Sequence, residues 1–306
     1  MHNNFLLNLN NNRFYLETIH NRIASGQMVN RPSDNPAAAS RIMTLRSALN
    51  EMHQHNNNMY DARSWLEISD NALNNAGAIF HRAREIAIYG AGGTMTTEQM
   101  GALADEIDQM LENLVQIANT THGSSHVFGG TNTTSPPFRI ERDNDGNITE
   151  IIFTGDSAPR EFEVSPGVRI MVNSTDAFQL GGAVDGDDVL EEGLFGVLFD
   201  LSNLLRTGNV EELSNRIIGD NDTYIDGAMS HILSERASLG ARSNRMAMAL
   251  RRNIDAQFEF TQTMSRLADT DYAREMINFS VQQVAFQATV MSGAQILQPS
   301  LLDFLR

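Results

Sequence analysis

The residues of this 306-residue chain that could most readily bind a metal or transfer a proton are its eight histidines. His122 and His126 are four residues apart, a spacing that would place both imidazoles on one face of a helix. The intervening Gly123-Ser124-Ser125 disfavours a helix, however, and supplies no glutamate to complete a zinc motif of this kind. His53 and His55 alternate within a helical stretch and so face apart. We therefore predict no metal site and assign the histidines to surface or interface positions.

Other patterns that resemble reactive or ligand-binding sites each lack a required residue. The glycine-rich stretches 90–93 and 129–131 have no Gly-Lys-Ser/Thr ending of a phosphate-binding loop, and the chain contains no lysine. Residues 143–146 resemble part of a calcium loop, but Ile152 stands where a bidentate glutamate is required, so a hairpin turn is favoured. The carboxylates of residues 185–192 indicate a solvated acidic face. With no cysteine and no nucleophile-elbow motif, the sequence predicts no catalytic residue, no cofactor and no enzyme activity.

The charge of the chain is negative and unevenly distributed. All 22 cationic residues are arginine, against 38 Asp and Glu, and the formal net charge is −16. A nucleic-acid partner is therefore not expected, because it would require a basic face. Residues 139–233 hold 6 Arg and 19 acidic residues, whereas 1–138 hold 8 and 12, and 234–306 hold 8 and 7. We thus expect an acidic exterior carried on nearly charge-balanced terminal arms.

Neither a membrane span nor a cleaved secretion signal is expected. No window approaches the roughly 18 consecutive apolar residues of a spanning helix. Residues 1–4 carry no Lys or Arg, and the apolar cluster Phe5 to Leu9 is interrupted at Asn8. The sequence therefore predicts a soluble protein, or one that leaves the cell by a route without cleavage.

Both ends of the chain show the spacing of coiled-coil helices. Near the N-terminus, apolar residues alternate at intervals of four and three from Phe5 to Ile23, with Asn12 in the one gap, and Gly26 is a plausible helix end. Asp34 or Asn35 could cap the next helix, with Pro36 at its first position. The C-terminal stretch carries three seven-residue series, so its helix needs partners on several sides. These series are Ile277, Val284 and Met291; Val281 and Ala288; Phe279 and Phe286.

The middle of the chain is helical on both sides of a β-rich segment. Helices are expected at 37–89, at 97–119 and at 190–206, and helical signal resumes near residue 223 and continues to Pro299. Short β-rich runs separated by turn signals occur at 148–154, 161–164 and 168–172.

The fold class is therefore mainly α with a small β insert. We expect long antiparallel helical coiled-coil arms from both termini and a central antiparallel β-domain. The expected divisions are an N-terminal arm at 1–40, the two halves of a helical domain at 41–137 and 186–268, an outward insert at 138–185, and a C-terminal arm at 269–306.

Three segments of the chain resemble the signatures of bacterial flagellins and their relatives. Residues 23–39 read IASGQMVNRPSDNPAAA, residues 234–245 read SERASLGARSNR, and residues 269–273 read DTDYA. The stretches 128–132 and 136–138, the insert patterns 153–156, 166–167 and 172–173, and the ending 297–305 resemble the hook-associated branch of this superfamily more than filament flagellin. Asp176 departs from the pattern, since a glycine is commoner near that position.

The resemblance implies a structural subunit of the bacterial flagellum at the junction between hook and filament. It implies export through the flagellar type III apparatus without a cleaved signal, and a place outside the cell. The implied partners are further copies of the chain in a ring, the first hook-associated junction protein on the proximal side, flagellin on the distal side, and an export chaperone at the C-terminal helix. A short filament flagellin is the alternative within the family, and an adhesin or carbohydrate-binding insert is the alternative outside it.

We expect the apolar stripes of both arms to form the assembly interface, ordering fully against each other or against neighbouring subunits. An intramolecular helix bundle is the alternative for the N-terminal stripe. The expected interface residues are Phe5, Leu9, Leu16, Ile19, Ile23, Ile277, Val281, Val284, Ala288, Met291, Leu301, Leu302 and Leu305.

Overall fold

The computed structural model describes residues 2–142, 148–174, 176–178, 188–189, 193–217 and 224–297. The chain forms two compact units. The arm unit consists of residues 1–53 and 254–306, and the body unit consists of residues 54–253. Two long helices, α2 (Pro36–Ala91) and α6 (Ile225–Ala268), contribute residues to both units.

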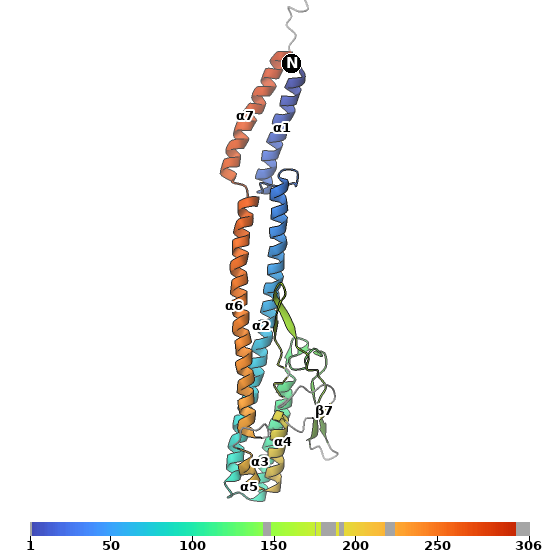
Figure 1. Ribbon diagram of the computed structural model, residues 1–306, viewed down its shortest axis with the longest axis vertical. Coiled ribbons are helices and arrows are strands. Elements are labelled where there is room, and N and C mark those ends of the chain that lie inside the picture. Colours follow the sequence, from blue (N-terminus) through green and yellow to red (C-terminus); the bar gives the residue numbers. More distant parts are fainter. Residues whose placement is uncertain are drawn as a thin grey trace, which may run out of the picture. The chain divides into compact units, whose positions relative to one another are not determined.

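In the arm unit, α1 (His2–Ser25) and α7 (Tyr272–Leu297) lie side by side (Figure 1). The two helices are antiparallel, because the start of α1 contacts the end of α7 and the end of α1 contacts its start: Phe5 meets Gly293, and Arg22 meets Glu275. The antiparallel terminal arms expected from the sequence are therefore present.

The segments that lead out of α1 and into α7 are joined by backbone hydrogen bonds. The Thr270 N–H donates to the Gly26 carbonyl at 2.9 Å, and the Met28 N–H donates to the Ala268 carbonyl at 2.7 Å. Gly26 has a φ of +69°, a conformation that favours glycine, so α1 ends there as expected.

The expectation of continuous helix from residue 223 to Pro299 is wrong at residues 269–271, where α6 ends and α7 begins. The Asp271 carboxylate accepts a hydrogen bond from the Arg274 N–H at 3.2 Å, which is the geometry of a helix N-cap. An aspartate that accepts a hydrogen bond from a free N–H stabilises the start of a new helix. No proline or glycine marks such a start, so the positions of these two residues do not predict it.

The start of α2 follows the expected capping chemistry. The Asn35 side chain accepts from the Ala38 N–H at 3.1 Å, with Pro36 as the first helical residue. Asp34 instead accepts from the N–H groups of Asn30 and Arg31, so of the two expected caps Asn35 acts as the cap and Asp34 orders the loop.

In the body unit, α2 and α6 are antiparallel neighbours. Two contacts show this: an ion pair joins Arg84 to Asp226 at one end, and a hydrogen bond joins Asn56 to Asn253 at the other. Helices α3 (Thr97–Ala118), α4 (Gly193–Thr207) and α5 (Val210–Asn215) complete this unit, and α3 packs closely on α4. The expected helices at 37–89, 97–119 and 190–206 are confirmed to within a few residues; residues 190–192 lie outside the described part.

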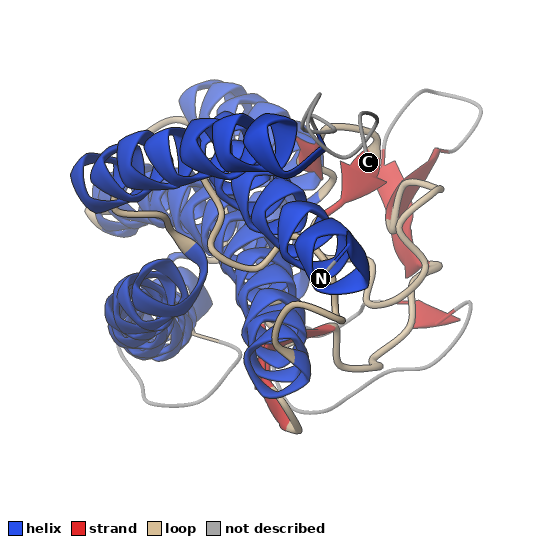
Figure 2. Ribbon diagram, turned by 90° about the horizontal axis from the view of Figure 1, so that it is seen from above, coloured by secondary structure: helices blue, strands red, loops and turns tan. Residues whose placement is uncertain are grey.

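The strands are short and lie beside the helices (Figure 2). Hairpins join β1 (Thr121–His122) to β2 (Ser125–His126) and β5 (Glu161–Ser165) to β6 (Val168–Met171), both antiparallel. A three-stranded antiparallel sheet has the order β3-β4-β7. Its members are β3 (Phe138–Arg142), β4 (Ile148–Phe153) and β7 (Asp188–Val189). The three expected β-rich runs are confirmed, and β1, β2, β3 and β7 are additional strands.

Phenylalanine rings join the sheet to the helices of the body unit. Phe138 on β3 lies 5.2 Å from Phe153 on β4 and 5.2 Å from Phe195 on α4, measured between ring centroids. Phe178 contacts Phe138 at 5.7 Å and Phe128 at 4.9 Å. All five rings are buried. The insert therefore shares one core with the helices.

Asp156 holds two loops of the insert together. Its carboxylate accepts from the N–H groups of Thr131 at 2.7 Å, Asn132 at 3.1 Å and Ala158 at 3.0 Å, and from the Thr131 hydroxyl. Burial alone would raise the pKa of Asp156, but the hydrogen bonds from Thr131, Ala158 and Asn132 outweigh it and lower the pKa. This carboxylate links the 128–132 and 153–156 patterns.

We expect Asp156→Asn to destabilise the body unit by about 1–3 kcal/mol, because the charge is lost and an amide nitrogen replaces one of the two oxygens that accept these hydrogen bonds. A lowered folded-state pKa contributes stability that is present above the unfolded pKa, about 3.9, and is lost as the pH falls through the folded pKa. Chemical denaturation at pH 7 and at pH 3 measures both effects. The difference between wild type and variant should shrink at pH 3, and an unchanged difference would contradict this account.

Candidate assembly surface

The contact between α1 and α7 follows a heptad seam on both helices. On α1 the expected residues Phe5, Leu9, Leu16, Ile19 and Ile23 are half-buried. On α7 the residues turned toward α1 are spaced by four and three, as in a coiled coil. They are Glu275, Phe279, Gln282, Phe286, Thr289 and Gly293, all half-buried or buried. The N-terminal stripe therefore packs against α7 of the same chain.

The seam also contains polar and small residues that an apolar pattern does not identify. The Asn12 amide donates to the Thr289 hydroxyl at 2.9 Å, and the Gln282 amide donates to the Asn12 side chain at 3.3 Å. Gly293 lies directly under the ring of Phe5, with no room for a Cβ atom. Asn12 therefore occupies a seam position rather than a gap, and a seam amide of this kind, here half-buried, fixes helix register.

The expected interface residues of α7 lie on its outer side. Ile277 is 66% exposed, Val284 65% and Met291 72%, and Val281 and Ala288 are also exposed. Since an α-helix turns about 100° per residue, these five residues form one narrow stripe about 160° from the seam. We call them the outer stripe. The remaining expected residues, Leu301, Leu302 and Leu305, lie outside the described residues.

The surroundings of the outer stripe carry little charge. From Met276 to Leu297, α7 contains no charged residue, and α1 contains only Arg13, Glu17 and Arg22 besides its histidines. The arm unit holds 8 Arg and 9 acidic residues, whereas the body unit holds 14 Arg and 29 acidic residues. A nearly neutral surface can be buried in a contact without removing many charges from water.

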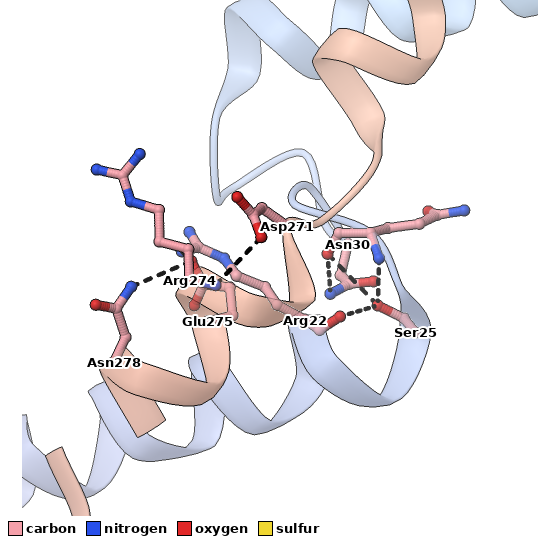
Figure 3. Close-up of polar contacts among 8 residues, drawn as sticks. Arg22, Ser25, Asn30, Asp271, Arg274, Glu275 and Asn278 are labelled. Carbon is pink, nitrogen blue, oxygen red and sulfur yellow. Dashed lines mark hydrogen bonds and ion pairs between the residues drawn. The ribbon is translucent and has the colours of Figure 1, made fainter. Parts of the chain in front are cut away.

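A buried ion pair lies where α1 ends and α7 begins. Figure 3 shows Arg22 beside Glu275, with Arg274 and Asn278 close by. The Arg22 guanidinium lies 3.9 Å from the Glu275 carboxylate, and the Asn278 amide donates to that carboxylate at 3.5 Å. Glu275 is only 4% exposed, so removal of Arg22, which is half-buried, would leave a buried carboxylate without its cation. The sequence does not predict this pair, because the residues next to Glu275 along the chain are exposed and nothing marks Glu275 itself as buried.

The described residues show no centre for chemistry. No three His, Asp or Glu side chains within them gather as a metal ion would require. His122 and His126 lie on the β1–β2 hairpin rather than on a helix, where His122 contacts the Ser64 hydroxyl at 3.0 Å and His126 the Asn119 carbonyl at 2.9 Å. Residues 143–146 are outside the described part. Among the described helices, none is both long enough and apolar enough to cross a bilayer.

Two family models match the chain at its ends. The bacterial flagellin N-terminal helical region matches residues 1–133, and the bacterial flagellin C-terminal helical region matches residues 223–305. Together they take in most of the chain, including α1, α7 and both long helices. The chain therefore belongs to the bacterial flagellin family.

Individual relatives lie within the same family. Flagellar hook-associated protein 3 of Escherichia coli K12 is 25% identical over 292 residues, covering 91% of this chain and 91% of its own. Flagellin of Bacillus subtilis 168 is 25% identical over 298 residues, covering 93% and 91%. The crystal structure of flagellar hook-associated protein 3 from Legionella pneumophila superposes with a TM-score of 0.60 at 20% identity, over 74% of this chain and 98% of that one. This last similarity shows a shared fold.

We expect Gly293→Val to weaken the pairing of α1 with α7 by about 1–3 kcal/mol, because the new side chain would overlap the Phe5 ring. Hydrogen exchange of the α1 amides measures this loss. Ala294→Val is the matched control, since Ala294 is the next residue on the same helix and is exposed. Equal exchange in both variants would show that Phe5 does not pack on Gly293.

Proposed function

We propose that this chain is a structural subunit of the bacterial flagellum that forms the junction between the hook-associated proteins and the flagellin filament. Its family membership and its similarity to hook-associated protein 3 over nearly the whole of both chains support this role. The observation that carries the proposal is the outer stripe on α7, because a monomer would leave five apolar residues exposed along a stretch of helix, 276–297, that contains no charged residue.

Self-association through the outer stripe has the energetics of a repeating assembly. Burying the side chains of Ile277, Val281, Val284 and Met291 contributes about 6–12 kcal/mol, at roughly 1.5–3 kcal/mol each. Forming one contact costs about 4–15 kcal/mol in lost freedom and side-chain ordering. A single contact is therefore marginal. Closing a ring adds one further contact without the cost of bringing in another subunit, so a ring is more stable than an open row of the same subunits.

The same surface supports the remaining partners that we propose. Before assembly the outer stripe is an aggregation risk, and an export chaperone bound to α7 would cover it. Once the subunit has been exported without signal cleavage, the ring would contact the first hook-associated junction protein on its proximal side and flagellin on its distal side. The acidic body unit would face outward, where its net charge favours solubility.

The role that we propose for each segment of the chain follows from this arrangement. We propose assembly arms at 1–40 and 269–306, a helical domain at 41–137 and 186–268, and an outward insert at 138–185. The protein acts by packing and not by catalysis. Leu301, Leu302 and Leu305 belong to the proposed interface as a continuation of the C-terminal arm.

We expect Val284→Asn to reduce assembly strongly while leaving the free protein folded, because an exposed valine contributes nothing to the fold of the monomer and an amide in its place must be desolvated on association. Incorporation into flagella and the circular dichroism of the purified protein measure the two effects. Leu7→Asn is the matched control, an exposed apolar residue of α1 turned away from α7. Equal losses from both variants would contradict a specific role for the outer stripe.

A deletion strain separates the junction role from that of a short filament flagellin, which the similarity to flagellins also supports. Loss of a junction subunit should leave hooks of normal length and release unpolymerised flagellin into the medium. Immuno-electron microscopy should then place the restored protein in a narrow band next to the hook. Filaments of normal length in the deletion strain, or label along a whole filament, would overturn the junction role.

A further inference from the structure

Most half-buried arginines of the body unit are paired with an aspartate. The pairs in the described part of this unit are Arg84–Asp226 at 2.8 Å, Arg216–Asp200 at 3.1 Å and Arg236–Asp70 at 2.9 Å. The two other half-buried arginines, Arg160 and Arg242, have no carboxylate partner among the described residues. Because the unit holds 29 acidic residues against 14 Arg, a shortage of carboxylates does not explain the difference.

Arg160 is held over an aromatic ring just before β5 begins. Its guanidinium carbon lies 4.1 Å from the centroid of the Trp65 ring and 5.7 Å from that of the Phe162 ring. A guanidinium over a ring keeps its N–H groups available for an acceptor, because they lie in its own plane. Burial lowers the pKa of Arg160, since desolvation disfavours the charged form. Arg160 is therefore an oriented cation without a counter-ion in the described structure.

Arg160 and Arg242 meet at one buried residue, Asn173. The Arg242 guanidinium donates to the Asn173 carbonyl at 2.7 Å, and the Arg160 backbone N–H donates to the Asn173 side chain at 2.8 Å. Asn173 is fully buried, so its position between the two arginines is fixed by packing. The two cationic side chains therefore start from the same place in the fold.

The register of α2 on α6 also brings Arg242 close to Trp65. Two contacts define this register, Asp70 with Arg236 and Asn56 with Asn253. The helices are antiparallel and rise equally per residue, so moving from Arg236 to Arg242 along α6 corresponds to moving from Asp70 back to the turn of α2 that carries Trp65. Arg242 thus lies level with the ring on which Arg160 rests.

Trp65 adds an unpaired donor to this group. It is 2% exposed, and its indole Nε1 has no acceptor within the part of the chain that the structure describes. A buried N–H without an acceptor is costly, and each such group needs an explanation. An acceptor that binds here would satisfy the indole and the two guanidinium groups together.

The carboxylates nearest to these donors along the chain are engaged elsewhere. Glu161 faces Arg169 at 4.0 Å. The Glu163 carboxylate accepts from the Gly167 N–H at 3.1 Å. The Glu235 carboxylate accepts from the Ser174 hydroxyl. The described chain therefore presents cationic donors at this place without supplying their acceptor.

We propose that Arg160, Arg242 and Trp65 form a binding site for one doubly charged tetrahedral oxyanion, such as phosphate or sulfate. Two guanidinium groups match the charge of this ion, and three donor groups suit its four oxygens better than the two oxygens of a carboxylate. Because the body unit as a whole is acidic, short-range hydrogen bonds must hold the ion, and not the field of the unit.

A bound oxyanion would join the insert to both long helices. Arg160 directly precedes β5, Trp65 belongs to α2, and Arg242 belongs to α6. An ion that binds only the folded unit stabilises it as the ion concentration rises. The site uses no residue of the arm unit, so it does not depend on the assembly role proposed above.

The only tryptophan of the chain, Trp65, reports directly on this site. The purified full chain would be titrated with sodium phosphate at constant ionic strength, while tryptophan fluorescence and the thermal unfolding midpoint are followed. Sodium chloride and sodium acetate are the comparison salts. We expect phosphate to change the fluorescence saturably and to raise the midpoint, acetate to act more weakly, and chloride to give no saturable change.

Arg160→Gln and Arg242→Gln should each weaken phosphate binding at least about tenfold, because each removes charge-assisted hydrogen bonds. Circular dichroism checks that the variants fold. Arg242→Gln leaves Arg160 over Trp65 and so remains informative if Arg160→Gln does not fold. Arg251→Gln is the matched control, since Arg251 is an exposed arginine of the same helix as Arg242, and its phosphate affinity should equal that of the wild type.

Equal responses to phosphate and chloride would refute the site, because they would reflect ionic strength alone. Wild-type affinity in folded Arg242→Gln, or an equal loss in Arg251→Gln, would also refute it. Equal binding of acetate and phosphate would overturn the choice of a doubly charged ion in favour of a carboxylate ligand.

Discussion

The antiparallel pairing of α1 with α7 is the contact on which the rest of the arm depends. Helix α1 contributes one row of large apolar side chains and Asn12 to this contact. Helix α7 contributes Phe279, Phe286 and smaller or polar residues. This seam fixes how α7 is rotated. Because α7 is rotated in this way, a second apolar row must point outward, and that row is the surface we assign to assembly.

Two features keep this arrangement specific. Gly293 lets the Phe5 ring approach the backbone of α7, and the Arg22–Glu275 pair marks the other end of the same seam. The Glu275 carboxylate is buried, and leaving it without Arg22 would be destabilising, so the pair favours one register of α1 on α7. A defined register is what positions the asparagines of α1 beside the small residues of α7.

Much of the fold follows from patterns of the sequence that act locally. The heptad spacing of the first helix, the proline and asparagine at the start of α2, and the turn residues of the β-rich segment each predicted an element that the structure contains. The break at residues 269–271 was missed because Asp271 caps a helix without any helix-breaking residue. The seam of α7 was only partly detected, because Glu275, Gln282 and Gly293 belong to it through contacts with a helix more than 250 residues away. Which of several stripes on α7 faces inward is a tertiary property that periodicity alone does not determine.

The central claim is that the outer stripe is exposed in the free subunit and buried in the flagellum. The chemical accessibility of a single cysteine at Val284, in a chain that otherwise has none, tests this most directly. A maleimide should label this position rapidly in the purified monomer and at a greatly reduced rate in assembled flagella, while a cysteine at exposed Asp61 of the body unit should be labelled in both. Equal labelling of the Val284 position in monomer and flagellum would contradict the account.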